Sequence, residues 1–301
     1  MSQQIKNVAI AGATGSAGSK ILRALIDSGK FNVTVIARKP SSSLPSDAKV
    51  KVVDFDSPEA LFDAFKGQDA VIDVTMSPDA AMPLRMIDAG VKAGVKRFVP
   101  SEFSLDPQNA AGRTVPVYMF KNQVIDRLKE LAAANKMTFT SISNGAFLDW
   151  NLRTGFFKID LKNKKAELLN GGSVVIPWTL LEQVGKAVVG VLLHLEETKN
   201  RFVYISNVEK TQKEMVDLAQ EALGKDGWDV STLDMDKVYR ESLAQLQAGN
   251  VTFEVMGNMI LYCNSKPEFV GTWVKNDNVL LGLEAFSDER IKELIKSIAS
   301  E

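Results

Sequence analysis

Short apolar runs alternate with amphipathic stretches through the first half of the chain. Apolar, β-branched runs are typical of buried strands, and they occur at residues 8–11, 32–37, 49–53, 70–75, 97–100 and 138–143. Helical periodicity occupies the intervals at residues 20–28, 58–67, 83–93 and 118–135. Short apolar strands separated by helices are typical of a parallel sheet covered on both faces. The pattern therefore predicts an α/β fold with a doubly wound parallel sheet of the Rossmann type.

The pattern changes after Trp150. Asn170-Gly171-Gly172 is a turn signature between two short apolar runs, and it predicts a β-hairpin of residues 166–169 and 174–177. Beyond it we expect a helix at 179–195, a strand at 202–206 and a helix at 212–223, with a mostly helical remainder.

These elements suggest two parts. We expect a Rossmann domain over residues 1–150, to which residues 178–225 partly return. A smaller α+β substrate-binding part would comprise residues 151–177 and 226–301. Because ligands of open α/β sheets bind at the carboxyl ends of the strands, we expect the site in the cleft between the two parts.

Composition narrows the chemistry. The 301 residues include 36 basic and 37 acidic side chains, and the net charge of −1 argues against nucleic acid as the main partner. Cys263 and His194 are single residues of their kinds, which excludes a disulfide framework within one chain and a Cys/His zinc cluster. A serine hydrolase would need His194 as its base. These exclusions favour chemistry carried by a bound cofactor and predict no metal.

The apolar runs of the sequence are too short to direct the chain to secretion or to span a membrane. The run at residues 8–11 is shorter than a signal-peptide core, and the run at residues 184–195 is shorter than the ~20 residues of a membrane span. We therefore expect a cytoplasmic protein with no membrane partner. Whether it forms an oligomer is left open.

A glycine-rich turn follows the first predicted strand and precedes the first helix. It has the form G-x-x-G-x-x-G, and its candidate coenzyme-binding residues are Gly12, Thr14, Gly15, Ser16, Ala17 and Gly18. Glycines let the backbone approach a diphosphate, and a helix N-terminus offers free N–H groups and a positive dipole end. A tight turn that needs glycine for itself is the alternative. The strand–turn–helix context favours dinucleotide binding.

A basic pair ends the second predicted strand. Dinucleotide-binding proteins that prefer NAD usually carry an acid about 20 residues past the glycines, where it binds a ribose hydroxyl. Here that position is Arg38, followed by Lys39. An arginine can hold a 2′-phosphate by two charged hydrogen bonds, so we expect NADPH/NADP+ as the cofactor. A solvated surface arginine is the alternative.

Loops after the later strands should line the reacting end of the coenzyme. Their candidate contact residues are Thr75, Ser77, Ser101, Phe103, Asn144 and Phe147. Tyr118 and Lys121 are i and i+3 in a predicted helix and should point to one face. A lysine beside a cationic nicotinamide can have a lowered pKa and move a proton. We therefore predict Lys121 as the principal catalytic residue, with Tyr118 as a second candidate. An exposed lysine on a surface helix is the alternative.

Other polar and aromatic residues are given lesser roles. We expect Glu102 to be a solvated or capping loop residue and His194 to serve a helix end or packing. A flat apolar wall for an aromatic substrate would consist of Phe103, Phe147, Trp150, Phe156 and Phe157, although core packing is the commoner role of such residues.

These motifs together resemble a known family. The sequence is similar to the isoflavone reductase-like and NmrA-like group of atypical short-chain dehydrogenases, and most similar to its fungal members. The residues that carry this resemblance are the GATGSAG turn, Arg38, the run from Arg97 to Phe103, the helix with Lys121 and the run from Ser143 to Phe147. The resemblance implies an NADPH-binding domain with a small substrate-binding domain. It also implies that Lys121 matches the lysine assigned as proton acceptor in the plant reductases.

The leading hypothesis is an NADPH-dependent reductase of a small, aromatic or polyketide-like metabolite. NADPH would deliver a hydride to an electrophilic carbon, and Lys121 would handle the proton. Two alternatives stay open. One is a dinucleotide-sensing regulator without turnover, which the NmrA branch suggests, and the other is an isomerase or cyclase that holds NADP(H) without consuming it.

Overall fold

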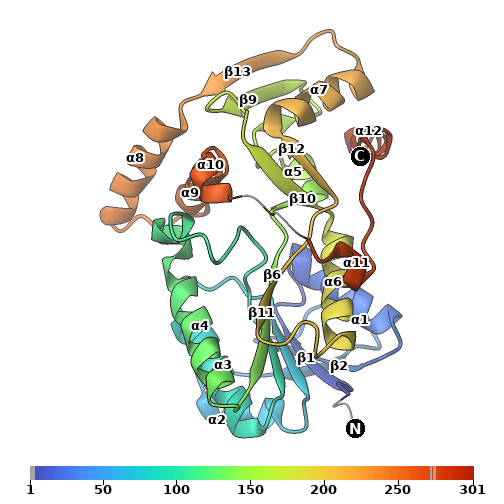
Figure 1. Cartoon of the computed structure of the whole chain (residues 1–301), viewed down its shortest axis with the longest axis vertical. Coiled ribbons are helices and arrows are strands. Elements are labelled where there is room, and N and C mark those ends of the chain that lie inside the picture. The colour runs from blue at the N-terminus through green and yellow to red at the C-terminus, as the bar shows by residue number, and fades with distance from the viewer. Residues whose placement is uncertain (1–3, 272, 274–275) are drawn as a thin grey trace.

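The computed structural model describes residues 4–271, 273 and 276–301. A seven-stranded parallel sheet forms the lower part of the molecule in Figure 1. Its strand order is β11-β6-β5-β4-β1-β2-β3. The strands are β1 (Asn7–Ala11), β2 (Asn32–Ala37), β3 (Lys49–Val52), β4 (Ala70–Asp73), β5 (Arg97–Val99), β6 (Thr138–Ser143) and β11 (Arg201–Tyr204). This is the strand order of the Rossmann fold with one added strand, and the predicted doubly wound sheet is confirmed.

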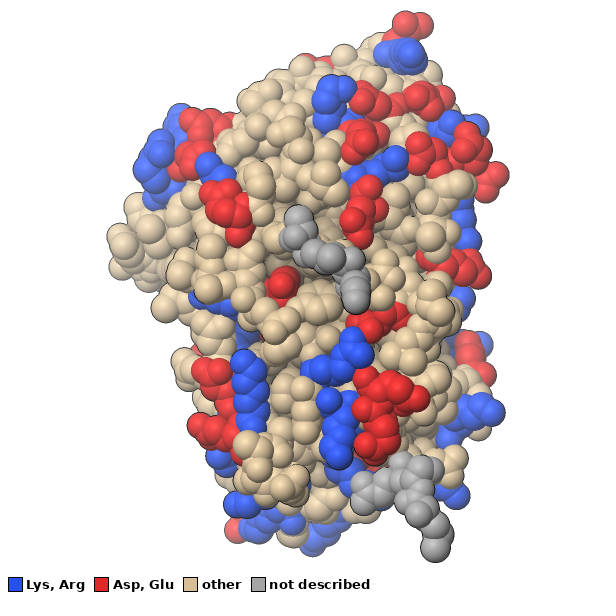
Figure 2. All heavy atoms as spheres, in the orientation of Figure 1, with Lys and Arg blue, Asp and Glu red and all other residues tan. Residues whose placement is uncertain are grey.

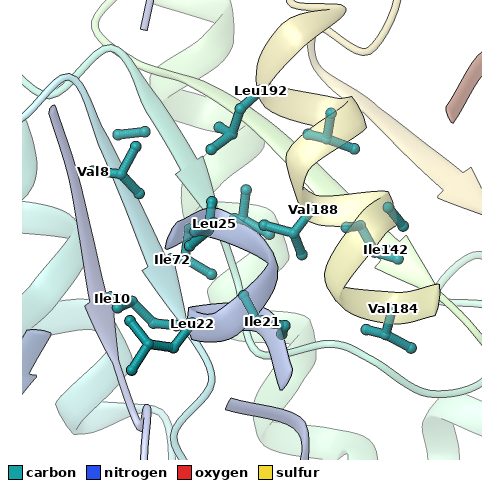
Figure 3. Close-up of a cluster of buried hydrophobic side chains, with 14 of the residues drawn as sticks. Val8, Ile10, Ile21, Leu22, Leu25, Ile72, Ile142, Val184, Val188 and Leu192 are labelled. Atoms are coloured by element: carbon teal, nitrogen blue, oxygen red, sulfur yellow. The ribbon is translucent and has the colours of Figure 1, made fainter. Parts of the chain in front are cut away.

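Helices cover both faces of this sheet, and each face has its own apolar core. On one face α1 (Ser16–Asp27) packs against α6 (Leu181–Leu193). Figure 3 shows their aliphatic side chains meeting those of the strands, with Ile21 and Leu25 of α1 near Val188 of α6. The other face is covered by α2 (Pro58–Phe65), α3 (Ala81–Ala93) and α4 (Pro116–Ala133). Helix α6 and strand β11 follow residue 177 in the chain and return to the large sheet.

Two three-stranded sheets lie beyond the large one. The first has the order β12-β10-β7 and the second the order β13-β9-β8. Their strands are β7 (Ala146–Phe147), β8 (Ile159–Asp160), β9 (Lys165–Leu169), β10 (Val175–Thr179), β12 (Val208–Thr211) and β13 (Asp229–Leu233). The remaining helices are the 3-10 helix η1 (Gly112–Thr114), α5 (Leu148–Thr154), α7 (Gln212–Leu223), α8 (Met235–Gln247), α9 (Phe253–Asn264), α10 (Pro267–Val270), α11 (Asn278–Leu281) and α12 (Asp288–Ala299). A separate apolar core around Trp178 holds this part together.

The predicted hairpin at residues 166–177 is wrong. β9 and β10 lie in different sheets: β9 pairs with β8 and β13, and β10 pairs with β7 and β12. The turn itself forms, but Asn170, Gly171 and Gly172 all have positive φ (48°, 85° and 66°). A two-residue hairpin turn needs only two such residues. The third redirects the chain, so the strands diverge.

Several predicted boundaries shift for local reasons. The first helix begins at Ser16 rather than residue 20, directly after the glycine turn. Strand β4 ends at Asp73 rather than residue 75, because the Asp73 carboxylate accepts the backbone N–H of Thr75 and turns the chain. Strand β5 ends at Val99, immediately before Pro100.

Surface charge matches the near-neutral composition. On the face in Figure 2, Lys and Arg side chains are interspersed with Asp and Glu, and neither sign covers the face alone. No helix in the described part of the chain is both long and apolar enough to span a bilayer. The same residues contain no cluster of three or more His, Cys, Asp or Glu side chains that could hold a metal ion.

Candidate functional site

A cavity of about 530 Å³ lies at the carboxyl ends of β4 and β5. The loops after these two strands form one wall, and Ala17 at the start of α1 adjoins them. Helix α4 contributes residues between Val117 and Val124, and the region around the start of α9 contributes residues between Val251 and Ile260. Strands β1 and β4 are neighbours in the sheet although β2 and β3 separate them in sequence. The cavity therefore lies near the point where the strand order reverses, which is where ligands bind in this class of fold.

The glycine turn is tightly packed at two of its glycines. Gly12 has φ of +85°, and a Cβ atom there would lie 2.4 Å from the carbonyl oxygen of Val74. A Cβ atom on Gly18 would lie 2.0 Å from the carbonyl oxygen of Gly12. Larger residues at either position would separate the turn from β4 or from α1. The backbone therefore needs both glycines for its own packing.

The outer surface of the same turn is open. A Cβ atom on Gly15 would meet nothing closer than 3.5 Å, and Thr14, Gly15 and Ser16 are exposed. Gly15 caps α1 without a side-chain hydrogen bond, so the first N–H groups of the helix are free of a capping side chain. A groove of free amides at a helix N-terminus fits a diphosphate group.

Arg38 and Lys39 directly follow β2, and both are exposed. β2 lies beside β1 in the sheet, so both residues lie at the same edge as the glycine turn. Among the described residues, no carboxylate is within ion-pair distance of either side chain. Both cations are thus available to a phosphate group.

Lys121 is partly buried in the cavity wall, with 17% of its side chain exposed. Its Nζ donates to the backbone carbonyl of Glu102 at 2.7 Å and lies 3.7 Å from the Glu102 carboxylate. Burial lowers the pKa of Lys121, and the positive charge of Arg113 adds to this, while Glu102 opposes it. The wall therefore contains an amine that loses its proton more readily than a free lysine.

Tyr118 lies on the same face of α4 as Lys121, as the spacing predicts. The Lys121 Nζ is 5.8 Å from the centre of the Tyr118 ring, and both residues line the cavity. The Tyr118 hydroxyl accepts a hydrogen bond from Ser104 at 3.1 Å. Burial raises the pKa of Tyr118 well above its usual value, which makes Tyr118 a poorer proton donor than a free tyrosine.

The expectation that Glu102 is solvated or a cap is wrong. It is only 3% exposed, and its carboxylate lies 2.8 Å from the guanidinium of Arg113, which is itself buried. Phe103, the next residue, has φ of +32°, a conformation that residues other than glycine rarely adopt. The sequence carried no signal for this pair, because Arg113 sits eleven positions away in the short helix η1.

Asp73 is a second buried acid that the sequence did not single out. It ends β4, is fully buried, and lines the cavity. Its Oδ1 accepts hydrogen bonds from the Thr75 backbone at 2.8 Å and from the Thr75 hydroxyl at 2.6 Å. Burial raises the pKa of Asp73 to about 6, although Thr75 and Lys121 oppose the shift. An acid next to the glycine turn therefore titrates near neutrality.

The other predicted contact residues divide into two groups. Thr75, Ser77, Ser101, Phe103 and Phe147 line the cavity. The Ser101 hydroxyl donates to the carbonyl of Thr75 at 2.8 Å, which ties the loops after β4 and β5 together. Asn144 is fully buried outside the residues that line the cavity, and its amide donates to the carbonyl of Gly145.

The predicted aromatic wall is partly wrong. Phe157 packs against Trp178 in the core of the smaller part, with ring centres 4.8 Å apart. Trp150 packs on Phe156, 5.2 Å away, and none of these rings lines the cavity. Phe120 and Phe253 join Phe103 and Phe147 in the wall instead. Aromatic residues occur in cores as well as in binding sites, and more commonly in cores, so composition could not separate the two roles.

The histidine is remote from this cavity. His194 ends α6, and its Nδ1 lies 3.7 Å from a carboxylate oxygen of Glu197. It does not line the cavity, in agreement with the expected role at a helix end.

Comparison with known proteins identifies the family. The model of the NmrA-like family matches residues 4–293. The chain belongs to the NmrA-like family. Among curated relatives of this NmrA-like protein, oxidoreductase aprR of Aspergillus flavus is 34% identical over 249 residues, which cover 81% of this chain and 82% of that protein. Oxidoreductase poxI of Penicillium oxalicum is 30% identical over 289 residues, covering 93% and 90%.

Solved structures show the same fold for this NmrA-like protein. The leucoanthocyanidin reductase–NADPH complex of Vitis vinifera superposes with a TM-score of 0.78 at 16% identity, over 98% of this chain and all of that one. The resemblance to isoflavone reductase-like and NmrA-like proteins that the motifs indicate is confirmed.

Proposed function

We propose that this protein is an NADPH-dependent reductase of a small, largely apolar metabolite with an aromatic or polyketide skeleton. One observation carries the proposal: an open glycine turn and a partly buried lysine belong to the same end of the sheet, and Ala17 beside the turn lines the same cavity as the lysine. Relatives that share about a third of their residues with this chain are named oxidoreductases. A protein of the same fold binds NADPH.

The coenzyme fits the residues that are present. The free amides at the start of α1 would hold its diphosphate, and Arg38 with Lys39 would hold the 2′-phosphate. Thr75, Ser77, Ser101 and Phe103 would position the remainder, with Asn144 and Phe147 as further predicted contacts. When bound, NADPH supplies the hydride.

The chain itself would handle the proton. The hydrogen bond from Lys121 to the carbonyl of Glu102 fixes the amine in the wall and leaves its other N–H bonds for the cavity. Because burial lowers the pKa of Lys121, the ammonium gives up its proton more easily than a solvated lysine. Tyr118, with a raised pKa, would shape the wall beneath it and is the weaker candidate for proton transfer.

The substrate would contact both parts of the chain. We assign residues 1–150, with 178–225 partly returning, to coenzyme binding, and residues 151–177 and 226–301 to the substrate. Phe253, Met256 and Ile260 on α9 line the same cavity as Phe103 and Phe147. Such apolar walls favour a substrate that buries flat carbon surface and exclude water from the reaction.

The test is oxidation of NADPH, followed by absorbance, with a panel of α,β-unsaturated ketones and phenolic ethers. Lys121→Met should lower kcat by about 100-fold or more, because general acid catalysis typically contributes that much. Lys129→Met, an exposed lysine on the same helix, is the matched control and should keep full activity. Full activity in Lys121→Met would refute the role of the lysine.

The same assay separates the alternatives. Tight binding of the dinucleotide without turnover of any substrate would favour the sensing regulator, and recovery of a protein partner would support it. Product formation without a change in nicotinamide absorbance would favour the isomerase or cyclase.

A further inference from the structure

Asp73 has a carboxylate oxygen that the fold leaves unused. The residue is fully buried at the end of β4, and its Oδ1 takes both hydrogen bonds from Thr75. Its Oδ2 is buried without a hydrogen-bond partner among the described residues. A buried, unpaired carboxylate oxygen costs free energy, so its retention in a cavity wall calls for a ligand or a proton.

The position of Asp73 connects it to the glycine turn. Asp73 pairs with Ala11, the last residue of β1 before the turn. The next residue, Val74, presents the carbonyl on which Gly12 packs. A diphosphate on the turn would bring negative charge close to the end of β4, where an ionised Asp73 would repel it.

The charged surroundings of Asp73 are sparse. Its partner on β1 is Ala11, which carries no charge. On the other side, β5 pairs with β4 only as far as Ile72, whose partner is the apolar Val99. Lys121 on α4 is the one charged side chain of the described residues that affects its titration, and this effect favours the carboxylate. Burial outweighs it and brings the pKa to about 6, so the carboxyl changes charge within the working range of most proteins.

We propose that Asp73 takes up a proton from solvent when the dinucleotide binds and stays protonated in the complex. The neutral carboxyl removes the repulsion from the diphosphate, and its O–H becomes a donor in the cavity. The affinity for the coenzyme then falls as the pH rises above 6. This inference rests on the proposed function, because it requires a dinucleotide on the glycine turn.

The test is calorimetric titration of the full chain with NADPH at pH 7 in two buffers of different ionisation enthalpy, which counts the protons taken up. About nine tenths of Asp73 is ionised in the free protein at that pH, so binding should add up to about 0.9 proton. The 2′-phosphate of NADPH also titrates near pH 6 and contributes to the count. That contribution is the same in every variant, so the difference between variants isolates Asp73.

Asp73→Asn mimics the protonated acid and should lose this proton uptake. It should also bind NADPH at least tenfold more tightly than the natural chain at pH 8, while the two bind equally at pH 5. Asp217→Asn, an exposed aspartate on α7, is the control and should match the natural chain throughout. Equal proton counts and equal pH dependence in Asp73→Asn and the natural chain would overturn the inference.

A second variant covers the case in which Asp73→Asn does not fold. Thr75→Val removes the hydroxyl that stabilises the Asp73 carboxylate. It should move the fall in NADPH affinity to higher pH, and an unmoved profile would contradict the inference. If the natural chain binds no NADPH at any pH, the proposed function fails. Binding without the linked proton refutes only the role of Asp73.

Discussion

The buried pair of Glu102 and Arg113 gives a sharp prediction about stability. Arg113→Met would leave the Glu102 carboxylate, whose side chain is 2% exposed, with only Lys121 at 3.7 Å as a cationic neighbour. Removing one partner of a buried pair typically costs about 3–5 kcal/mol, because the other charge stays buried without compensation. Total unfolding free energies of proteins lie near 5–15 kcal/mol, so the loss is a large share.

Urea unfolding followed by circular dichroism measures the effect. Arg113→Met should lower the free energy of unfolding by about 3–5 kcal/mol. The double variant with Glu102→Gln removes both charges and should recover at least about 2 kcal/mol of this loss. Arg127→Met breaks an exposed pair between Arg127 of α4 and Asp88 of α3 and should cost less than about 1 kcal/mol.

Two results would refute this reasoning. One is a loss in Arg113→Met no larger than the loss in Arg127→Met. The other is a double variant that loses the sum of its two single changes, since independent sites add and coupled charges do not.

Three further predictions concern the coenzyme and the lysine. Gly18→Ala should destabilise the chain by more than about 2 kcal/mol and weaken NADPH binding, because the added Cβ would lie 2.0 Å from the carbonyl oxygen of Gly12. Gly15→Ala should fold normally, and equal melting temperatures of the two variants would contradict the prediction. Arg38→Glu should weaken NADPH binding by roughly 100-fold and NADH binding by less than about threefold, because repulsion replaces attraction only for the extra phosphate. Equal losses of affinity in the two titrations would refute the assignment of Arg38 to the 2′-phosphate. Acetylation of Lys121 by acetic anhydride, followed by mass spectrometry, should reach half its maximal rate at a lower pH than acetylation of N-acetyl-lysine amide, because burial lowers the pKa of the Lys121 amine. A midpoint at or above that of the free compound would show that Lys121 is not desolvated.

Patterns within single segments predicted the large sheet. Strands such as β2 and β6 are rich in apolar and β-branched residues, and the helices between strands carry one apolar face, so local sequence indicates both. The hairpin failed because its outcome depends on distant partners. β9 pairs with β13, which lies more than 60 positions further along the chain. The residues around Asn170 carry no sequence pattern that predicts this pairing.

The site shows the same division. The glycine turn and Arg38 are short motifs with fixed spacing, so the sequence identified candidates that the fold brings to one edge of the sheet. Glu102 and Asp73 were missed because burial decides their chemistry. A glutamate in a loop is expected to be solvated, and only the fold shows that Arg113 lies beside Glu102. Asp73 ends an apolar strand and belongs to no recognisable motif. Similarly, the aromatic residues of the cavity wall and those of the core are of the same types, so the sequence alone does not separate them.

Fluorescence titration of the purified chain with NADPH tests the central claim most directly. The account predicts saturable binding of one NADPH per chain, displacement by NADP+, and at least about tenfold weaker binding of NADH because Arg38 would hold the 2′-phosphate. A chain that binds neither NADPH nor NADP+ at millimolar concentration would contradict it.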